Sequence, residues 1–109
     1  MQRAEYRQKI MNHLGSAYLL SDARIEEVLP RFTATLESLM NDLDKVSDSG
    51  NFEALNRTGH AMKGALLNLG LRQLADIAFS IEKFDALQAG EADVVIFIAE
   101  LRKELDKII

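Results

Sequence analysis

The sequence predicts an all-α fold: an up-and-down antiparallel four-helix bundle with an additional short N-terminal helix. Apolar residues recur at intervals of three and four in segment after segment, which is the spacing of one face of an α-helix. Sustained alternation of apolar and polar residues, the pattern of a half-buried strand, is absent. Short turns separate the segments, and short connections favour antiparallel neighbours. The 109 residues therefore predict a single helical domain, with an N-terminal helix at about 2–15 and a bundle at about 22–108.

The first segment, at about 2–15, carries a narrow apolar stripe, which predicts a helix that lies across one end of the core. Its apolar residues are Tyr6, Ile10, Leu14 and, at the edge of the stripe, Met11. Gly15 and Ser16 come at its end and are expected to terminate the helix.

The second segment, at about 22–47, has the spacing of a bundle seam, because its apolar residues are separated by alternating gaps of four and three. These residues are Ile25, Leu29, Phe32, Leu36, Leu39, Leu43 and Val46. Ser21 or Asp22 is expected to cap the N-terminus. Pro30 conflicts with a regular helix, since it removes a backbone hydrogen bond and clashes with the preceding turn. We expect either a kink there, or a short helix followed by a longer one with Pro30 in its first turn.

Three further helices are predicted, at about 51–68, 71–88 and 91–107. Gly70 and Gly90 lie just past the third and the fourth and are expected to stop them. The apolar residues of the fourth are Leu71, Leu74, Ile77, Ala78, Ile81 and Phe84. The fifth contains "VVIFIA", which by itself is typical of a buried strand. The longer window favours a helix, because Val94, Ile98, Leu101, Leu105 and Ile108 recur at gaps of four and three.

Composition excludes several classes of protein. The chain is 48% apolar and 28% charged, which is typical of a folded domain, and it has no cysteine for a disulfide or a zinc–thiolate site. The net charge of −4 argues against a nucleic-acid binder, which normally carries a basic face. No apolar run approaches the roughly 20 residues that span a bilayer, and the N-terminal segment has no apolar core of signal-peptide length. We expect a soluble, cytoplasmic and monomeric protein; it begins with Met1 and has the helices of a complete bundle, which favours a free-standing chain.

The third predicted helix has two distinct faces. On a helical wheel with His60 at zero, an apolar stripe falls between about 180° and 240°, directly opposite the imidazole. The stripe comprises Leu55, Met62, Leu66 and Leu69. Lys63, Gly64 and Leu67 fall within about 60° of His60, and Asn56 and Arg57 lie one turn earlier on the same side. The helix therefore presents an imidazole, cations, a gap and a single leucine on the face away from the core.

The chemistry available to this face is narrow. Neutral imidazole is a good nucleophile near pH 7, because its usual pKa lies close to that pH, and a phosphoryl group on a ring nitrogen is labile enough to pass on. Lys63, one turn away, can neutralise phosphoryl oxygens as a point charge. Glycine in a helix interior costs about 1 kcal/mol relative to alanine, and Gly64 would offset that cost by leaving room for an approaching partner. Leu67 supplies an exposed apolar contact for docking.

The stretch "HAMKGALLNLG" resembles the histidine-phosphotransfer (HPt) domains of two-component phosphorelays. Their signature is a histidine, any two residues, a lysine, a glycine, and then a small and apolar stretch that reaches a second glycine. The positions that fit it are His60, Lys63, Gly64, Leu69 and Gly70. The resemblance covers residues 25–88 well and the two ends by helix pattern alone. One departure is Leu66 and Leu67, where the family often has smaller residues, so Leu67 would alter which partners fit.

The resemblance implies a role for each residue of this face. His60 would accept a phosphoryl group from the aspartyl phosphate of a receiver domain and pass it to another receiver, Lys63 would aid transfer, and Gly64 would keep the surface open. Glu82 stands at the position where the family commonly has a Glu or Gln that hydrogen-bonds the other ring nitrogen, which would fix the tautomer. Docking would involve Gly64 and Leu67 together with Arg57 and Asn56.

The resemblance also implies the partners, which are the receiver domains of response regulators and hybrid histidine kinases. The chain itself would be a phosphocarrier without kinase activity or a cofactor, and Mg²⁺ would be supplied by the receiver. No Gly-rich phosphate-binding loop appears in the sequence.

Two other functions remain as alternatives. One is a non-phosphorylated helical interaction module of the same fold, which would dock proteins through the Leu67 face. The other is an enzymatic bundle with carboxylate metal ligands, which is disfavoured because the chain has no Glu-x-x-His pair. His13 shows no partner pattern and is interpreted as structural, and the two histidines without cysteine give no metal-site spacing.

Overall fold

The computed structural model describes residues 1–85 and 91–109, and the side chains of all of these except residues 91 and 92. Helices are the regular secondary structure of the described residues, which include no strand, and this confirms the predicted all-α fold class. The helices are α1 (Arg3–Ala17), α2 (Asp22–Ser47), α3 (Phe52–Asn68), α4 (Arg72–Glu82) and α5 (Glu91–Leu105).

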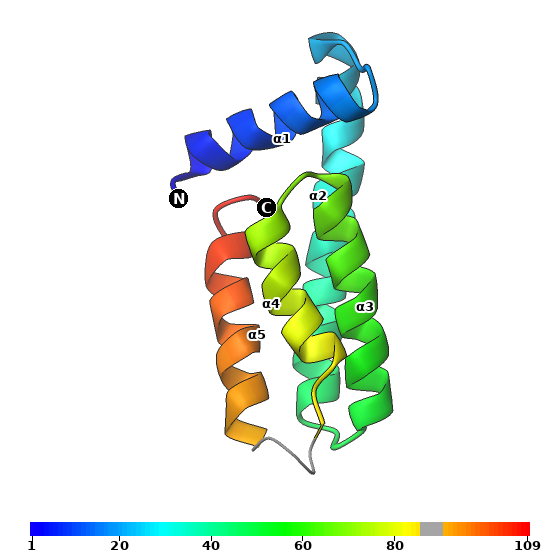
Figure 1. Cartoon of the computed structure of the whole chain (residues 1–109), viewed down its shortest axis with the longest axis vertical. Coiled ribbons are helices and arrows are strands. Elements are labelled where there is room, and N and C mark those ends of the chain that lie inside the picture. Colours follow the sequence, from blue (N-terminus) through cyan, green and yellow to red (C-terminus); the bar gives the residue numbers. More distant parts are fainter. Residues whose placement is uncertain (86–90) are drawn as a thin grey trace.

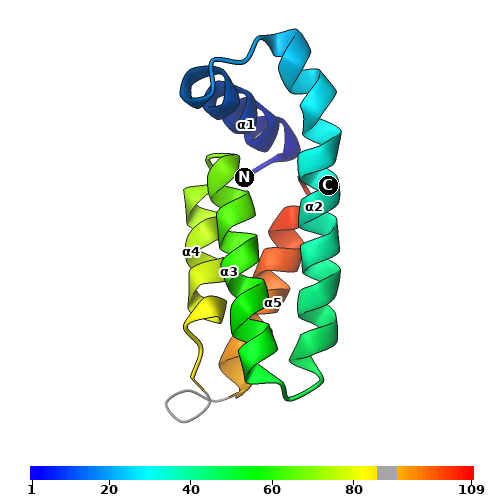
Figure 2. The ribbon, with the colours of Figure 1, turned by 90° about the vertical axis from the view of Figure 1, so that its right-hand side faces the viewer.

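Helices α2 to α5 run side by side in alternating directions, and α1 crosses one end of this bundle (Figures 1 and 2). Both termini lie near the end that α1 covers (Figure 1). The molecule measures 46 × 22 × 19 Å along its principal axes. The site-bearing helix α3 packs most extensively against α4 and α2.

The core is made by the residues that the helical spacing predicted. The seam of α2 and the stripe of α3 are buried or half-buried at every predicted position. Fully buried members include Ile25, Leu36, Leu43, Met62, Leu66 and Leu69. No polar or charged residue is fully buried in the described part of the chain.

Helix α1 runs two residues further than predicted, because Gly15 and Ser16 lie inside it. The helix ends when Leu19 adopts a left-handed φ of 56°, and the Tyr18 and Leu20 amides then both donate to the Leu14 carbonyl. Leucine rarely takes this conformation, which is why the sequence pointed to the glycine instead.

Side chains fasten α1 to the far end of the chain. The Arg3 guanidinium donates to the Asp106 and Ile109 carbonyls, and the Tyr6 hydroxyl donates to Glu104 Oε2 at 2.9 Å. Burial, reinforced by the Glu104 carboxylate, raises the pKa of Tyr6 to about 12. The phenol therefore stays neutral while α1 is in place.

Helix α2 passes through Pro30 as one helix, so the alternative of two successive helices is wrong. Pro30 has no amide hydrogen, so the backbone carbonyl four residues earlier loses its helical donor. Pro30 lies on an exposed part of α2, so water can hydrate that carbonyl. The N-terminal part of α2 leans away from the rest of its axis (Figure 2). Ser21 is the N-cap, and its hydroxyl accepts from the Arg24 amide at 3.2 Å.

Helix α4 ends at Glu82, and the predicted continuation to residue 88 is wrong for residues 83–85, which are not helical. Residues 86–88 and Gly90, the expected stop, lie outside the described residues. After the helix ends, Phe84 turns into the core, where it is 7% exposed and packs 5.7 Å from the Phe52 ring. Phe84 therefore fitted the apolar spacing of the predicted helix because it is buried, although it is not itself helical.

None of the described helices is long and apolar enough to span a membrane.

Candidate functional site

Helix α3 places His60 on the outer face, opposite the buried stripe. The helix starts at Phe52, where the Asn51 side chain accepts from the Ala54 amide at 3.0 Å. The buried stripe then fixes the rotation of the helix about its axis, and the His60 side chain is left 68% exposed. An imidazole at this position is accessible to another protein.

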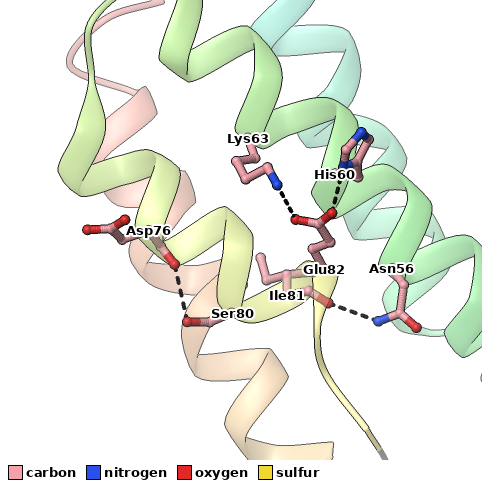
Figure 3. A network of polar contacts seen from close by, with 7 residues as sticks. All are labelled: Asn56, His60, Lys63, Asp76, Ser80, Ile81 and Glu82. Carbon is pink, nitrogen blue, oxygen red and sulfur yellow. Dashed lines mark hydrogen bonds and ion pairs between the residues drawn. The ribbon is translucent and has the colours of Figure 1, made fainter.

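Glu82 of α4 holds one nitrogen of the His60 ring. Its Oε1 lies 2.5 Å from His60 Nδ1, and the second nitrogen, Nε2, points away from the carboxylate (Figure 3). An ionised carboxylate only accepts hydrogen bonds, so this contact places the ring proton on Nδ1. The lone pair of the neutral ring is then on Nε2, at the outer surface.

Lys63 binds the other oxygen of the same carboxylate. Its Nζ lies 2.7 Å from Glu82 Oε2, an atom with no exposed surface, and the two side chains are 25% and 22% exposed (Figure 3). The ion pair with Lys63 and then the hydrogen bond with His60 hold the pKa of Glu82 below its usual value. Glu82 is therefore a carboxylate that bridges the imidazole and the ammonium.

An aromatic side chain lies beside this cluster. Phe79 of α4 is 43% exposed, and Lys63 Nζ lies 5.0 Å from the centre of its ring. Lys83 Nζ lies 4.8 Å from the same ring, so two ammonium groups contact one exposed aromatic. Sequence reasoning missed Phe79, although its spacing of four residues from Lys83 on a helix was a usable signal.

Gly64 and Leu67 lie on the exposed outer face of α3, one and two turns after His60. A Cβ atom at Gly64 would meet nothing within 4 Å, so this glycine makes no close contact between helices. Leu67 is 45% exposed. The two residues form an accessible strip along α3 next to the imidazole.

The two other predicted docking residues have partners within the chain. Arg57 pairs with Glu53 one turn earlier on α3, at 3.5 Å. Asn56 is half-buried, and its Nδ2 donates to the Ile81 and Phe84 carbonyls at 3.0 and 3.1 Å. The Asn56 amide thus serves the contact between α3 and α4.

Gly59 was not predicted as a site residue, yet it lies next to His60 and against the backbone of Glu82. It is buried, and a Cβ atom there would lie 2.7 Å from the Glu82 amide nitrogen. The signal in the sequence was a second glycine inside the same helix, next to the histidine.

A family model described as "Hpt domain" matches residues 27–109. This chain belongs to the Hpt domain family. Hpt domains carry out histidine phosphotransfer in two-component signalling, are phosphocarriers rather than autonomous kinases, and generally interact with receiver domains. The match includes the whole of α3, α4 and α5 and leaves α1 outside. Comparison with curated proteins and comparison with solved structures each gave no significant match.

Proposed function

We propose that this Hpt domain is a phosphocarrier whose His60 accepts a phosphoryl group from the aspartyl phosphate of one receiver domain and donates it to another. The observation that supports this most directly is the orientation of the ring. Glu82 occupies Nδ1, while Nε2 stands at the surface on a side chain that is 68% exposed. A surface histidine with one nitrogen fixed and the other free is arranged for attack by the free nitrogen.

The transfer requires no proton to leave the ring. The Nε2 lone pair forms a bond to phosphorus, and the bond between phosphorus and the aspartyl oxygen breaks, so the aspartate departs as a carboxylate. Attack leaves positive charge on the ring, and the Nδ1 proton stays hydrogen-bonded to the Glu82 carboxylate. That carboxylate therefore stabilises a charge that develops during the reaction. The reverse step returns the phosphoryl group to an aspartate by the same path.

Lys63 would stabilise the phosphoryl oxygens. Its ammonium lies one turn from His60 and is partly exposed while paired with Glu82. Since the phosphoryl group is anionic, a nearby cation lowers the energy of the transferring group. The receiver domain would supply Mg²⁺ and the aspartate, while Gly64 and Leu67 would provide the surface on which it docks.

A direct phosphotransfer assay tests this function. The chain is incubated with a receiver domain that carries a labelled aspartyl phosphate, and His60→Gln is the control. We expect label that is labile in acid and stable in base on the wild type, and none on the variant. The variant should keep its helical content, because His60 lies outside the core and its loss opens no cavity. Label retained by His60→Gln would refute the assignment of the acceptor.

The alternative is an interaction module of the same fold that is never phosphorylated. The exposed Leu67 and Phe79 beside His60 favour docking under either function. Binding of a receiver without any transfer of label would support the interaction module over the phosphocarrier.

A further inference from the structure

Helices α3 and α4 are in backbone contact at Gly59. A Cβ atom at this position would lie 2.7 Å from Glu82 N and 3.1 Å from both Glu82 Cα and the Ile81 carbonyl carbon. All three atoms belong to the backbone, so no side-chain rotation can make room. Alanine at this position would push the last turn of α4 outward. The distance from the new Cβ to Glu82 N would have to grow from 2.7 Å to the 3.4 Å at which ordinary contact begins.

Asn56 binds the same turn of α4 one helical turn earlier on α3. Its amide donates to the Ile81 and Phe84 carbonyls (Figure 3 shows the first of these bonds). The Ile81 carbonyl lies in the last turn of α4, where intrahelical donors run out, and it also accepts from the Phe84 amide. The Phe84 carbonyl lies two residues past the end of the helix. The Asn56 side chain therefore hydrogen-bonds the backbone at the end of α4 and holds it against α3.

Glu82 gains its position from these two contacts. It is the last residue of α4, and the C-terminal end of a helix disfavours a carboxylate because the macrodipole is negative there. Helix ends also fray, so a terminal residue is poorly placed unless tertiary contacts hold it. Gly59 and Asn56 hold the backbone on either side of Glu82, and its carboxylate then reaches both His60 and Lys63.

We infer that Gly59 and Asn56 are positioning residues, which set the tautomer and the reactivity of His60 by fixing the end of α4 that carries Glu82. The inference rests on the proposed phosphocarrier function for its consequence in transfer. Its structural part, the coupling between His60 and Glu82, is measurable without any phosphoryl donor.

The first arm of the test is NMR of the unphosphorylated chain. Gly59→Ala and Asn56→Ala are compared with wild type and with Gly15→Ala, a control that adds the same methyl group to α1 at an ordinary 3.7 Å from the Leu20 carbonyl. Nitrogen-15 shifts of the His60 ring report which nitrogen carries the proton. We expect the Nδ1–H form in wild type and control, and a shift toward the Nε2–H form in both variants.

The Glu82 carboxyl gives a second reading in the same samples. Its pKa should rise toward the usual value for glutamate in Gly59→Ala and Asn56→Ala, because the bonds from Lys63 and His60 that lower it are weakened. Asn56→Ala adds no bulk, so it remains informative if Gly59→Ala folds poorly. Circular dichroism establishes that each protein retains its helices.

The second arm measures phosphorylation by a labelled receiver. Both variants should be slower than wild type by about 10-fold, as expected when a reacting group is misplaced by a fraction of an ångström, and Gly15→Ala should match wild type. Ring and carboxyl signals unchanged in either variant would overturn the inference, as would wild-type rates despite changed signals. A wild type that accepts no phosphoryl group would instead refute the proposed function, and the NMR arm would still decide the coupling.

Discussion

The two glycines of α3 should respond to the same substitution in opposite directions. Gly64→Ala adds a methyl group to open space, since nothing lies within 4 Å of the new Cβ. The free energy of unfolding should then rise by the propensity difference alone, about 0.5–1 kcal/mol. With an unfolding entropy of roughly 2.1 cal/mol/K per residue, this raises Tm by about 2–4 °C for a chain of this length.

Gly59→Ala gains the same helix propensity but meets the backbone of Glu82 at 2.7 Å. Overpacking of this kind costs about 1–3 kcal/mol, which exceeds the gain, so Tm should fall. Thermal unfolding followed by circular dichroism, with urea titrations for the free energy, measures both variants against wild type. A lower Tm for Gly64→Ala would show that this glycine serves a close packing contact and would refute the reasoning from open space.

The access that Gly64 provides is tested by a larger side chain. Gly64→Gln should keep the fold at least as stable as wild type, because glutamine is a good helix former, while it slows phosphorylation by a receiver and weakens docking. The measurements are initial rates of labelling and binding affinity for the receiver. Wild-type rates with Gly64→Gln would mean that the partner does not approach over this glycine.

Other substitutions separate the remaining contributions. Lys63→Ala should slow transfer by about 10-fold and leave His60 as the labelled residue. Equal transfer rates for the variant and the wild type, measured in a stopped assay, would show that Lys63 has no part in the transfer step. Glu82→Gln, which keeps an acceptor without the charge, should slow labelling less than Glu82→Ala, and the reverse order would contradict a hydrogen-bonding role. Leu19→Gly should raise the free energy of unfolding by about 1 kcal/mol, measured in urea, because glycine relieves the left-handed φ of 56°. Tyr6→Phe should remove a loss of stability at high pH. The native pKa of Tyr6, about 12, lies above its unfolded value of 10.0. The neutral phenol therefore contributes its full stabilisation below pH 10, and this is lost as the pH rises toward 12. Parallel urea midpoints across that range for both proteins would rule this out.

The helices of the bundle were predictable because their signal is local. The seam of α2 and the stripe of α3 repeat along the chain with the helical period, and burial follows directly from that pattern. The ends of α1 and α4 were not predictable in the same way. The end of α1 depends on Leu19 in a conformation that leucine avoids. The end of α4 depends on the Asn56 side chain of α3, which donates to one carbonyl in its last turn and to one just past it.

The outer face of α3 was predictable to the extent that a helical wheel separates it from the core. His60, Gly64 and Leu67 are exposed as the wheel required. The wheel cannot say which neighbouring helix borders that face, so it gave no warning that Asn56 is engaged by α4. The contact between Glu82 and His60 was expected only from family resemblance, since it joins residues 22 positions apart.

The position of Gly59 on the same wheel explains how the site is built. It falls at about 260°, between the buried stripe and His60, and Asn56 and Lys63 border it at about 320° and 300°. All three contact the last turn of α4. The Asn56 side-chain amide donates to the Ile81 carbonyl, Gly59 lies against the Glu82 backbone, and Lys63 pairs with the Glu82 carboxylate. The other side of His60 carries a glycine with open space around it. One edge of the imidazole is thus fixed by α4, because Gly59 lets the two helices approach closely. The opposite edge stays clear, because Gly64 carries no side chain.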